Sequence, residues 1–327
     1  MTDPKHPPAA AAAAAAAVRG SALSDALAIA RYHIVLVAMG GMLTFGWLMT
    51  QRYLFALALV VGLDWFLINL LNRITDIAED LRNRIAGTER VAQKQRPLTA
   101  LAAVLGVGSF VLTHLVWPQL TPLRIAVQLI GLGYNYRIVP SLRGLTRFAR
   151  FKELYFFKNF GSAVLFVLTC FAYPLAVAGA QRVLPWAAIV TLALFFMLFE
   201  TTYEILYDFR DLEGDRALGV PTYPVVHGER TAYRIMNGLL LAAELVLAVG
   251  LATGVLGVRE ALMAVAPLTQ YLFYRRYRVA APSPFHLSLS SRDCVLLTHL
   301  GTAQLLLFLC GTALWQHLGL PANIFLR

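Results

Sequence analysis

The chain has 327 residues, of which 58% are hydrophobic and only 14% are charged, and its formal net charge at pH 7 is +10. Soluble domains carry about 25% charged residues, so this composition excludes intrinsic disorder, a collagen-like fibre, a disulfide-rich scaffold and most soluble enzymes. The apolar residues form blocks of roughly 15 to 25, the length that a helix needs to cross a bilayer. The sequence therefore predicts an all-α, polytopic membrane protein.

The N-terminal segment differs from the rest of the chain. Residues 9–17 are nine consecutive alanines, and they lack the Leu-rich stretch and the cleavage site of a secretory signal peptide. We expect residues 1–25 to form a disordered, Ala-rich tail and residues 26–320 to form a single intramembrane domain. The three cysteines show no paired spacing and indicate neither a disulfide framework nor a zinc site.

Nine apolar blocks are candidate transmembrane helices. Two of them are weak, because the fourth has Arg124 and Arg137 near its ends and the eighth contains Pro267. A count of seven or eight spans is therefore also compatible with the sequence. The nine blocks are residues 32–50, 53–71, 98–117, 122–139, 159–181, 185–207, 235–258, 260–274 and 294–319.

Basic residues give an independent test of this topology, because short loops rich in Lys and Arg remain on the cytoplasmic side. With nine spans and a cytoplasmic N-terminus, 23 of the 28 basic residues fall on one side of the membrane. We therefore expect a multi-pass protein of the bacterial inner membrane with its N-terminus and charged loops in the cytoplasm. A basic face against anionic membrane lipid accounts for the net charge without nucleic acid.

The acidic residues are concentrated in two stretches that hold half of the 18 Asp and Glu residues. In the first stretch Asn72, Asp76 and Asp80 recur every four residues, which on one helix would place three oxygen-bearing side chains along one stripe. The second stretch is residues 200–215, in which the acids at 204, 208, 211 and 215 form the regular part. Its spacing of four, three and four again predicts a single helical face. Each stretch begins at the end of a span and continues into a basic loop.

Two acidic stripes at the same side of the bilayer repel each other unless a cation lies between them. Carboxylates and an amide oxygen are hard ligands that suit Mg²⁺ rather than zinc or copper. Because Mg²⁺ usually binds through one or two carboxylates together with phosphate oxygens, we expect a phosphate or diphosphate between the stripes. Basic residues beside the stripes can neutralise it, although each is also explained as a loop charge. They are Arg82, Arg84, Lys94, Arg96, Lys152, Lys158, Arg210 and Arg216.

Two acidic residues lie deeper in the apolar spans. Asp64 falls inside the second span and Glu200 inside the sixth. Ionisable residues inside a membrane are costly and are usually functional. Each could orient an acceptor or relay a proton, or it could pair with a neighbouring polar group, and the sequence leaves these alternatives open.

Together, the two acidic motifs resemble those of the UbiA superfamily of intramembrane prenyltransferases. The first signature, Asn-x-x-x-Asp-x-x-x-Asp, is followed here by Lys94-Gln-Arg96-Pro, and the second, Asp-x-x-Asp-x-x-x-Asp, leads into Gly-Asp-Arg and Pro-Thr-Tyr-Pro-Val. Tyr134 and the pair Lys158-Asn159 resemble weaker features of the family. The resemblance covers residues 26–319, and the two motifs are specific in combination.

The resemblance implies nine helices around a central cavity, arranged as two four-helix halves plus a ninth helix. It also implies Mg²⁺-dependent transfer of a polyisoprenyl group from a prenyl diphosphate to an aromatic or other lipophilic acceptor. The implied catalytic residues are Asp76, Asp80, Asp211 and Asp215, and the implied metal ligands are these four with Asn72 and Asp208. The implied substrate-binding residues are Asn72, Lys94, Arg96, Tyr134, Lys158, Asn159, Asp208 and Arg216.

Three departures from the family pattern leave the acceptor open. Arg73 stands where many members have Asp, Asn135 stands where a small residue is common, and Tyr223 replaces a common Leu. None of them removes an implied metal ligand. The sequence also leaves the prenyl chain length and the oligomeric state undetermined.

Other functions compete with this interpretation. An ion- or proton-coupled transporter should carry its acids near the bilayer midplane, whereas here they cluster at one face. A CDP-alcohol-type lipid phosphotransferase has Gly where this chain has Asn72, and its upstream Asp-Gly-x-x-Ala-Arg element is absent. A relative that binds the substrate without catalysis is a further alternative.

Overall fold

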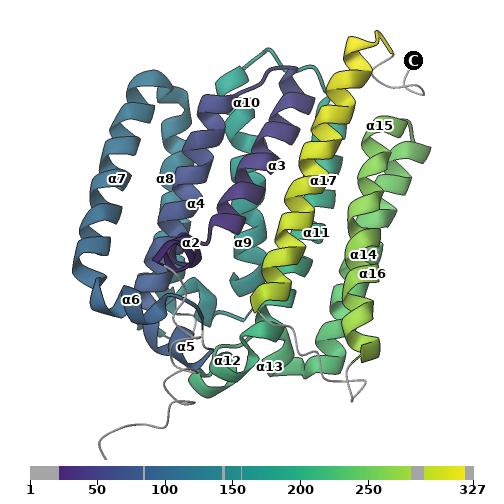
Figure 1. Ribbon diagram of the computed structural model, residues 1–327. Coiled ribbons are helices and arrows are strands. Elements are labelled where there is room, and N and C mark those ends of the chain that lie inside the picture. The colour runs from purple at the N-terminus through teal and green to yellow at the C-terminus, as the bar shows by residue number, and fades with distance from the viewer. Residues whose placement is uncertain (1–21, 84, 142–143, 156, 281–290, 321–327) are drawn as a thin grey trace, which may run out of the picture.

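The computed structural model describes residues 22–320 except 84, 142–143, 156 and 281–290 (Figure 1). Most of the expected N-terminal tail lies outside the described residues. The part inside belongs to α2, which begins at Ala22 and ends at Ala30. The prediction of an all-α architecture is confirmed.

Long apolar helices make up the bundle, because a chain segment in hydrocarbon must satisfy its backbone hydrogen bonds internally. The principal helices are α3 (Tyr32–Thr50), α4 (Phe55–Thr75), α7 (Gln95–Val116), α8 (Thr121–Asn135), α9 (Phe157–Val167), α10 (Tyr173–Ala178), α11 (Trp186–Arg210), α14 (Glu229–Ala252), α16 (Val265–Ala280) and α17 (Ser291–His317).

Short elements connect the principal helices. They are α5 (Ile77–Arg82), α6 (Thr88–Gln93), η1 (Pro118–Leu120), β1 (Val139–Ser141), β2 (Gly144–Ala149), η2 (Phe151–Glu153), the π-helical η3 (Leu168–Ala172), α12 (Leu212–Leu218), α13 (Tyr223–His227), α15 (Val258–Ala261) and η4 (Leu262–Ala264). β1 and β2 pair as an antiparallel hairpin between α8 and α9.

The count of nine spans is not confirmed. Within the described residues, seven helices are long and apolar enough to cross a membrane: α3, α4, α7, the α9–η3–α10 unit, α11, α14 and α17. The expected fourth span is α8, whose 15 residues extend roughly 22 Å and fall short of a bilayer core of about 30 Å. The expected eighth span is divided among α15, η4 and α16. These are the two blocks that already carried charges or proline.

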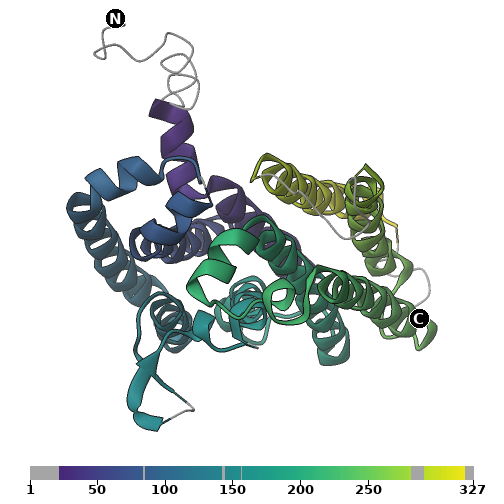
Figure 2. The same ribbon diagram turned by 90° about the horizontal axis from the view of Figure 1, so that it is seen from below.

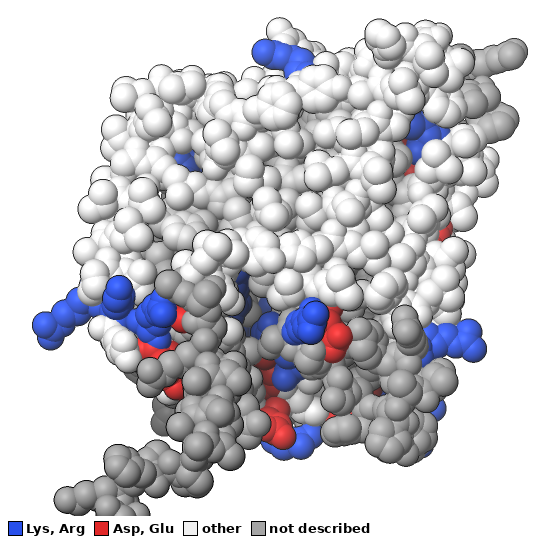
Figure 3. Space-filling model, in the orientation of Figure 1, with Lys and Arg blue, Asp and Glu red and all other residues white. Residues whose placement is uncertain are grey.

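The helices run up and down the bundle, so the connections alternate between its two ends. Figure 1 shows α2, α5, α6, α12 and α13 at the lower end. In the space-filling view of Figure 3, most of the charged residues on the visible face also gather at this end, below a broad uncharged band. Seen from the lower end in Figure 2, α12 and α13 lie across the middle of the bundle. Both acidic motifs therefore lie at one end.

Aromatic side chains fill the middle of the bundle. The ring of Trp65 on α4 stacks on Phe166 on α9 with centroids 3.8 Å apart, and its Nε1 donates to Thr169 Oγ1 at 3.1 Å. Thr169 lies in η3, the π-helical turn that precedes Pro174. Proline cannot donate the backbone hydrogen bond that a regular helix requires. The irregular turn thus places a hydroxyl that satisfies the buried indole.

Candidate active site

Each acidic motif is split between two helices at its central aspartate. Asp76 separates α4 from α5 with φ −107° and ψ 22°, and Asp211 separates α11 from α12 with φ −95° and ψ 8°. The prediction of one continuous helical stripe for each motif is therefore wrong. The chain turns at the central aspartate, so the last aspartate of each motif lies on a short helix at the lower end of the bundle.

The two motifs nevertheless meet at one polar pocket of about 90 Å³. Carboxylates outnumber cations on its walls, so the lining favours positively charged ligands. Its acidic lining residues are Asp76, Glu79, Asp80, Glu204, Asp208 and Asp211, and its basic ones are Arg31, Lys158 and Arg210. Asn69, Asn72, Tyr134, Ser162, Tyr207 and four apolar residues complete the walls.

The short helices α5 and α12 are joined directly. The Asn83 side chain, which follows α5, accepts a hydrogen bond from the Gly214 amide of α12 at 2.9 Å. A Cβ at position 214 would lie 2.5 Å from Asn83 Nδ2, so any larger residue would displace the Asn83 side chain from this position. The contact fixes the distance between the ends of the two motifs.

Cations and an amide engage the first aspartate of the site. Arg150 donates to Asp76 Oδ1 at 2.9 Å, Lys152 Nζ lies 2.6 Å from Asp76 Oδ2, and Asn72 also donates to Oδ2. Lys152 additionally reaches Glu79 at 2.8 Å. Both cations come from the segment after the β-hairpin, so this segment is held against the first acidic motif.

Asp80 is paired with the arginine that departs from the family pattern. Arg73 is fully buried on α4, donates to Asp80 Oδ2 and also donates to the Ala86 carbonyl at 2.6 Å. Burial raises the pKa of Asp80, while Arg31 and Arg73 oppose this shift. Arg73 therefore ties α5 and the following loop to the end of the span.

Lys158 links two aspartates of the second motif. Its Nζ lies 2.9 Å from Asp208 Oδ1 and 2.8 Å from Asp215 Oδ2, and Asn159 donates to Asp208 Oδ2 at 2.6 Å. Asp215 is completely buried, and no described residue hydrogen-bonds its Oδ1. Burial raises the pKa of Asp215 to about 7, although Lys158 acts in the opposite direction. One lysine thus bridges two buried acids.

Asp211 lies at the pocket wall beside Arg210, whose guanidinium contacts it at 2.5 Å. Burial alone would raise the pKa of Asp211, but Arg210 reverses the effect and lowers it. Asp211 therefore stays ionised over a wide pH range, as a ligand for a cation requires.

Residues 33–290 match the model of the UbiA prenyltransferase family. The chain belongs to this family. As a UbiA family member it is a prenyltransferase, and its fold agrees with solved relatives. A UbiA homologue from Archaeoglobus fulgidus bound to DMAPP and Mg²⁺ superposes with a TM-score of 0.64 at 15% identity, over 87% of this chain and 97% of that one. The same homologue bound to GPP and Mg²⁺ gives 0.61 at 15% identity, over 88% and 98%.

Sequence similarity links the chain to one curated relative over a shorter stretch. It is 33% identical over 124 residues to a digeranylgeranylglyceryl phosphate synthase of Haloquadratum walsbyi (strain DSM 16790 / HBSQ001). The aligned stretch is 37% of this chain and 42% of that protein. It thus covers less than half of the relative's length.

The structure brings together most of the expected site residues of this UbiA family member. Seven of them line the polar pocket: Asn72, Asp76, Asp80, Tyr134, Lys158, Asp208 and Asp211. Asp215 and Asn159 lie outside the lining and contact it through Lys158 and Asp208. The other three, Lys94, Arg96 and Arg216, are exposed and do not line the pocket.

The expected set omits several residues of the pocket. Arg31 lines it from the residue that joins α2 to α3, with a positive φ of 44°, and Arg150 reaches Asp76 from the end of the hairpin. In the sequence both residues lie outside the two acidic motifs, so no pattern assigned them to the site. Glu204 and Ser162, hydrogen-bonded to each other at 2.8 Å, also line the pocket. In the sequence, only the four-residue spacing between Glu204 and Asp208 indicated that Glu204 belongs to the second acidic motif.

The donor set fits a hard divalent cation, although no group of three His, Cys, Asp or Glu side chains in the described ranges is arranged to hold a metal ion. Mg²⁺ needs only one or two carboxylates when phosphate oxygens and water supply its other ligands. The pocket offers Asp76 and Asp80 on one side and Asp208 and Asp211 on the other. Side-chain cations now hold these carboxylates, so metal binding requires some of the ion pairs to exchange.

Proposed function

We propose that this UbiA family member transfers a polyisoprenyl group from an allylic prenyl diphosphate to a lipophilic acceptor, with Mg²⁺ as cofactor and diphosphate as the released product. The observation that most directly supports this proposal is that carboxylates from both motifs and the Lys158 ammonium line one pocket. Structures of the A. fulgidus homologue with prenyl diphosphates and Mg²⁺ support the same chemistry. Family membership favours it over a transporter or a CDP-alcohol phosphotransferase.

The aspartates that line the pocket would hold the metal, with Asn72 and Asp208 as supporting ligands. When bound, Mg²⁺ supplies positive charge that stabilises the departing diphosphate. Asp215, which lies outside the lining, positions Lys158. We assign diphosphate contacts to Lys158 and Arg31, which line the pocket, and to Lys94, Arg96 and Arg216 in the surrounding loops. We assign the catalytic role to three aspartates that line the pocket, Asp76, Asp80 and Asp211.

The reaction separates charge at the polar end of the bundle. The allylic C–O bond breaks, the electron pair leaves with the diphosphate, and the carbocation is attacked by an electron-rich carbon or a hydroxyl of the acceptor, which then loses a proton. Cations placed before the reaction stabilise the negative charge that develops on the leaving group. The aromatic rings of Trp65 and Tyr134 line the pocket and would limit the access of water to the cation.

This chemistry suits an integral membrane protein whose site opens at one membrane face. We propose a bacterial inner membrane, with the N-terminus and the loops around α5 and α12 in the cytoplasm, where soluble diphosphates are available. We also propose that residues 26–320 act as one domain, since the two motifs complete a single site. Anionic membrane lipid would contact the basic end.

The experiment is transfer of label from tritiated geranylgeranyl diphosphate into lipid, using purified protein in liposomes with a lipid extract as the acceptor source. We expect activity that requires Mg²⁺ and falls at least about 100-fold in Asp76→Asn and in Asp211→Asn. Glu213→Gln is the matched control, because Glu213 is an exposed acid beside the second motif that does not line the pocket. Folded aspartate variants with full activity would refute the assignment.

A further inference from the structure

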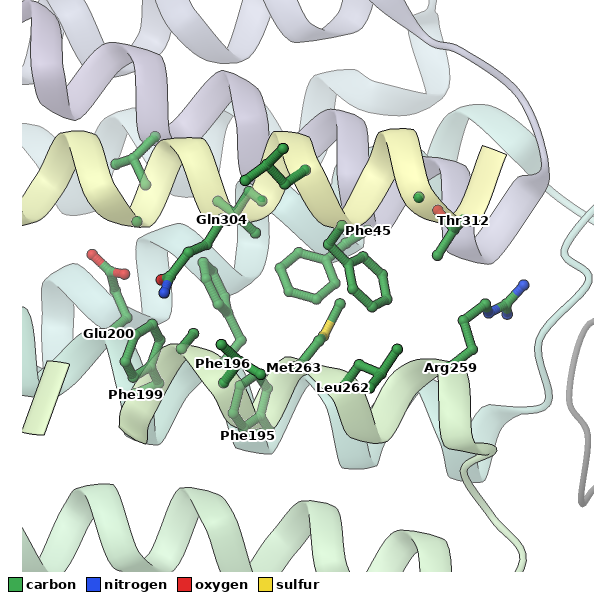
Figure 4. Close-up of a pocket in the computed structure, with 18 of the residues that line it drawn as sticks. Phe45, Phe195, Phe196, Phe199, Glu200, Arg259, Leu262, Met263, Gln304 and Thr312 are labelled. Carbon is green, nitrogen blue, oxygen red and sulfur yellow. The ribbon is translucent and has the colours of Figure 1, made fainter. Parts of the chain in front are cut away.

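A second and larger cavity lies beside the polar pocket. It encloses about 440 Å³ between α3, α11, α17 and the η4–α16 segment, a volume typical of small-molecule sites. Figure 4 shows Phe45, Phe195, Phe196 and Met263 along its middle, with Glu200 and Gln304 at one end and Arg259 at the other. The lining is almost entirely apolar, so these three side chains are its principal polar features.

The Glu200 end faces the proposed reaction site. Glu200 lies on α11 one turn before Glu204, which lines the polar pocket. One turn of helix rises about 5.4 Å, so the two cavities are close neighbours along α11. On α3 the relation repeats, because Val37 lines the apolar cavity and Ile34, three residues earlier, lines the polar pocket.

The cavity also reaches the membrane-facing surface of the bundle. Its lining residues Leu262, Val265 and Leu307 are 53%, 56% and 72% exposed. They lie on η4, α16 and α17. A lipophilic molecule can therefore enter between α16 and α17 from the bilayer without crossing the charged end.

Glu200 lacks a partner. It is 5% exposed, and no hydrogen bond or ion pair joins it to any other residue in the part of the chain that the structure describes. Arg259 does not pair with Glu200, because Arg259 is paired with Glu260 at the opposite end of the cavity. A buried carboxyl without a partner is costly in an apolar environment. The cost is recovered when a ligand brings a hydrogen-bond donor.

We infer that this cavity binds the acceptor, a lipophilic molecule whose polar head carries a hydroxyl or amine that donates to Glu200. The inference names the acceptor class and so rests on the proposed prenyl transfer. An isoprenoid tail carries no donor and would leave Glu200 unpaired, whereas a donor-bearing head would satisfy it. The Gln304 amide at the same end of the cavity provides a second polar contact. The head then lies one helical turn from the pocket where the allylic carbon becomes reactive.

The test compares 4-dodecylphenol with its methyl ether, which has the same ring and alkyl chain but cannot donate a hydrogen bond. Binding is measured by equilibrium dialysis on the full-length protein in detergent. We expect the wild-type protein to bind the phenol at least about tenfold more tightly than the ether, as satisfying a buried carboxyl that otherwise lacks a partner predicts. In Glu200→Leu the two compounds should bind equally.

Glu244→Leu is the matched control, because it also removes a carboxyl from an apolar helix but lies on α14 outside the cavity. It should keep the full preference for the phenol. If Glu200→Leu does not fold, Glu200→Gln carries the test, and it should reduce the preference about threefold or more, because one acceptor oxygen is replaced by an amide donor. Equal binding of the two compounds by the wild-type protein, or a preference that survives in the Glu200 variant that folds, would overturn the inference.

Binding of geranylgeranyl diphosphate with Mg²⁺, measured on the same samples, separates this inference from the proposed function. Glu200→Leu should retain diphosphate binding within about twofold, since Glu200 does not line the polar pocket. Failure of the wild-type protein to bind the diphosphate would refute the proposed function. Intact diphosphate binding without a preference for the phenol would refute only the acceptor cavity.

Discussion

Asp76 and Asp211 occupy equivalent backbone positions 135 residues apart, each between a membrane-length helix and a short helix that turns across the end of the bundle. Their φ angles differ by only 12° and their ψ angles by 14°. Because the chain turns at both residues, the short helices α5 and α12 approach each other. The geometry of the site therefore depends on the contact between those two short helices.

We predict that Gly214→Ala lowers prenyl transfer by about 10- to 100-fold, because an added Cβ would lie 2.5 Å from the Asn83 side chain, displace it and break the hydrogen bond that joins α5 to α12. Stability should fall by only about 1–3 kcal/mol, the usual cost of overpacking. Activity in liposomes and Tm in detergent measure the two effects. The control is Gly108→Ala, since a Cβ at position 108 has no neighbour within 4 Å. Unchanged activity in Gly214→Ala would contradict a geometric role for this contact.

Lys158 gives a prediction about charge. Lys158→Met should reduce transfer by about 100-fold or more, because it removes the cation between Asp208 and Asp215 and leaves two buried carboxylates that repel each other. Lys158→Arg should restore part of the activity, since it keeps the charge but not the shape. Initial rates with labelled geranylgeranyl diphosphate provide the measurement. Lys94→Met, at an exposed lysine outside the pocket, should lose less activity. An equal loss in the two variants would show that activity depends on the overall positive charge of this end of the bundle rather than on the contacts of Lys158.

Much of this site follows from spacing alone. Acids at intervals of three and four residues identified Asp76, Asp80, Asp208 and Asp211, and all four line the pocket. Spacing could not show the turn at Asp76, because nothing in its local pattern breaks the helical period. Such a turn is set by what the following segment packs against, and here that partner is α12, more than a hundred residues away.

Single cations were harder to predict than repeated acids. Arg150 contacts Asp76 only because the β1–β2 hairpin folds its chain back to the pocket. Arg96 lies close to the first motif in sequence but is exposed at the start of α7 and does not line the pocket. Hydropathy identified the seven long helices, and the charges and proline that weakened the fourth and eighth blocks fall where the structure has the short α8 and the divided α15–η4–α16 segment.

Lys152 provides a prediction for the metal. Its ammonium lies 2.6 Å from Asp76, so it competes with Mg²⁺ for the same carboxylate when no diphosphate is present. Lys152→Gln should therefore bind Mg²⁺ about three- to tenfold more tightly in the absence of substrate, because a nearby positive charge has been removed. Isothermal titration with MgCl₂ measures the change. Arg137→Gln is the comparison, because Arg137 is a loop arginine paired with Glu153 rather than with a pocket aspartate. Weaker or unchanged Mg²⁺ affinity in Lys152→Gln would contradict the competition.

The last prediction concerns Asp64, whose role the sequence left open. The structure pairs Asp64 with Arg124, and Gln128 and Tyr173 also donate to its carboxylate at 2.8 and 3.1 Å. Arg124 further donates to Thr113 on α7 at 2.9 Å. This network joins α4, α7, α8 and α10, and none of its residues lines the polar pocket, so we interpret it as a structural ion pair.

Removing one partner of such a pair leaves an uncompensated buried charge and typically costs about 3–5 kcal/mol. Arg124→Leu should therefore lower Tm strongly, and the double variant Asp64→Leu/Arg124→Leu should recover most of the loss, because no charge is then left unpaired. Thermal unfolding in detergent tests both, with Arg52→Leu as the control at an exposed arginine. If the double variant were as unstable as the sum of the two single ones, the pair would not be coupled. Asp64 would then be a candidate for the catalytic role that this network argues against.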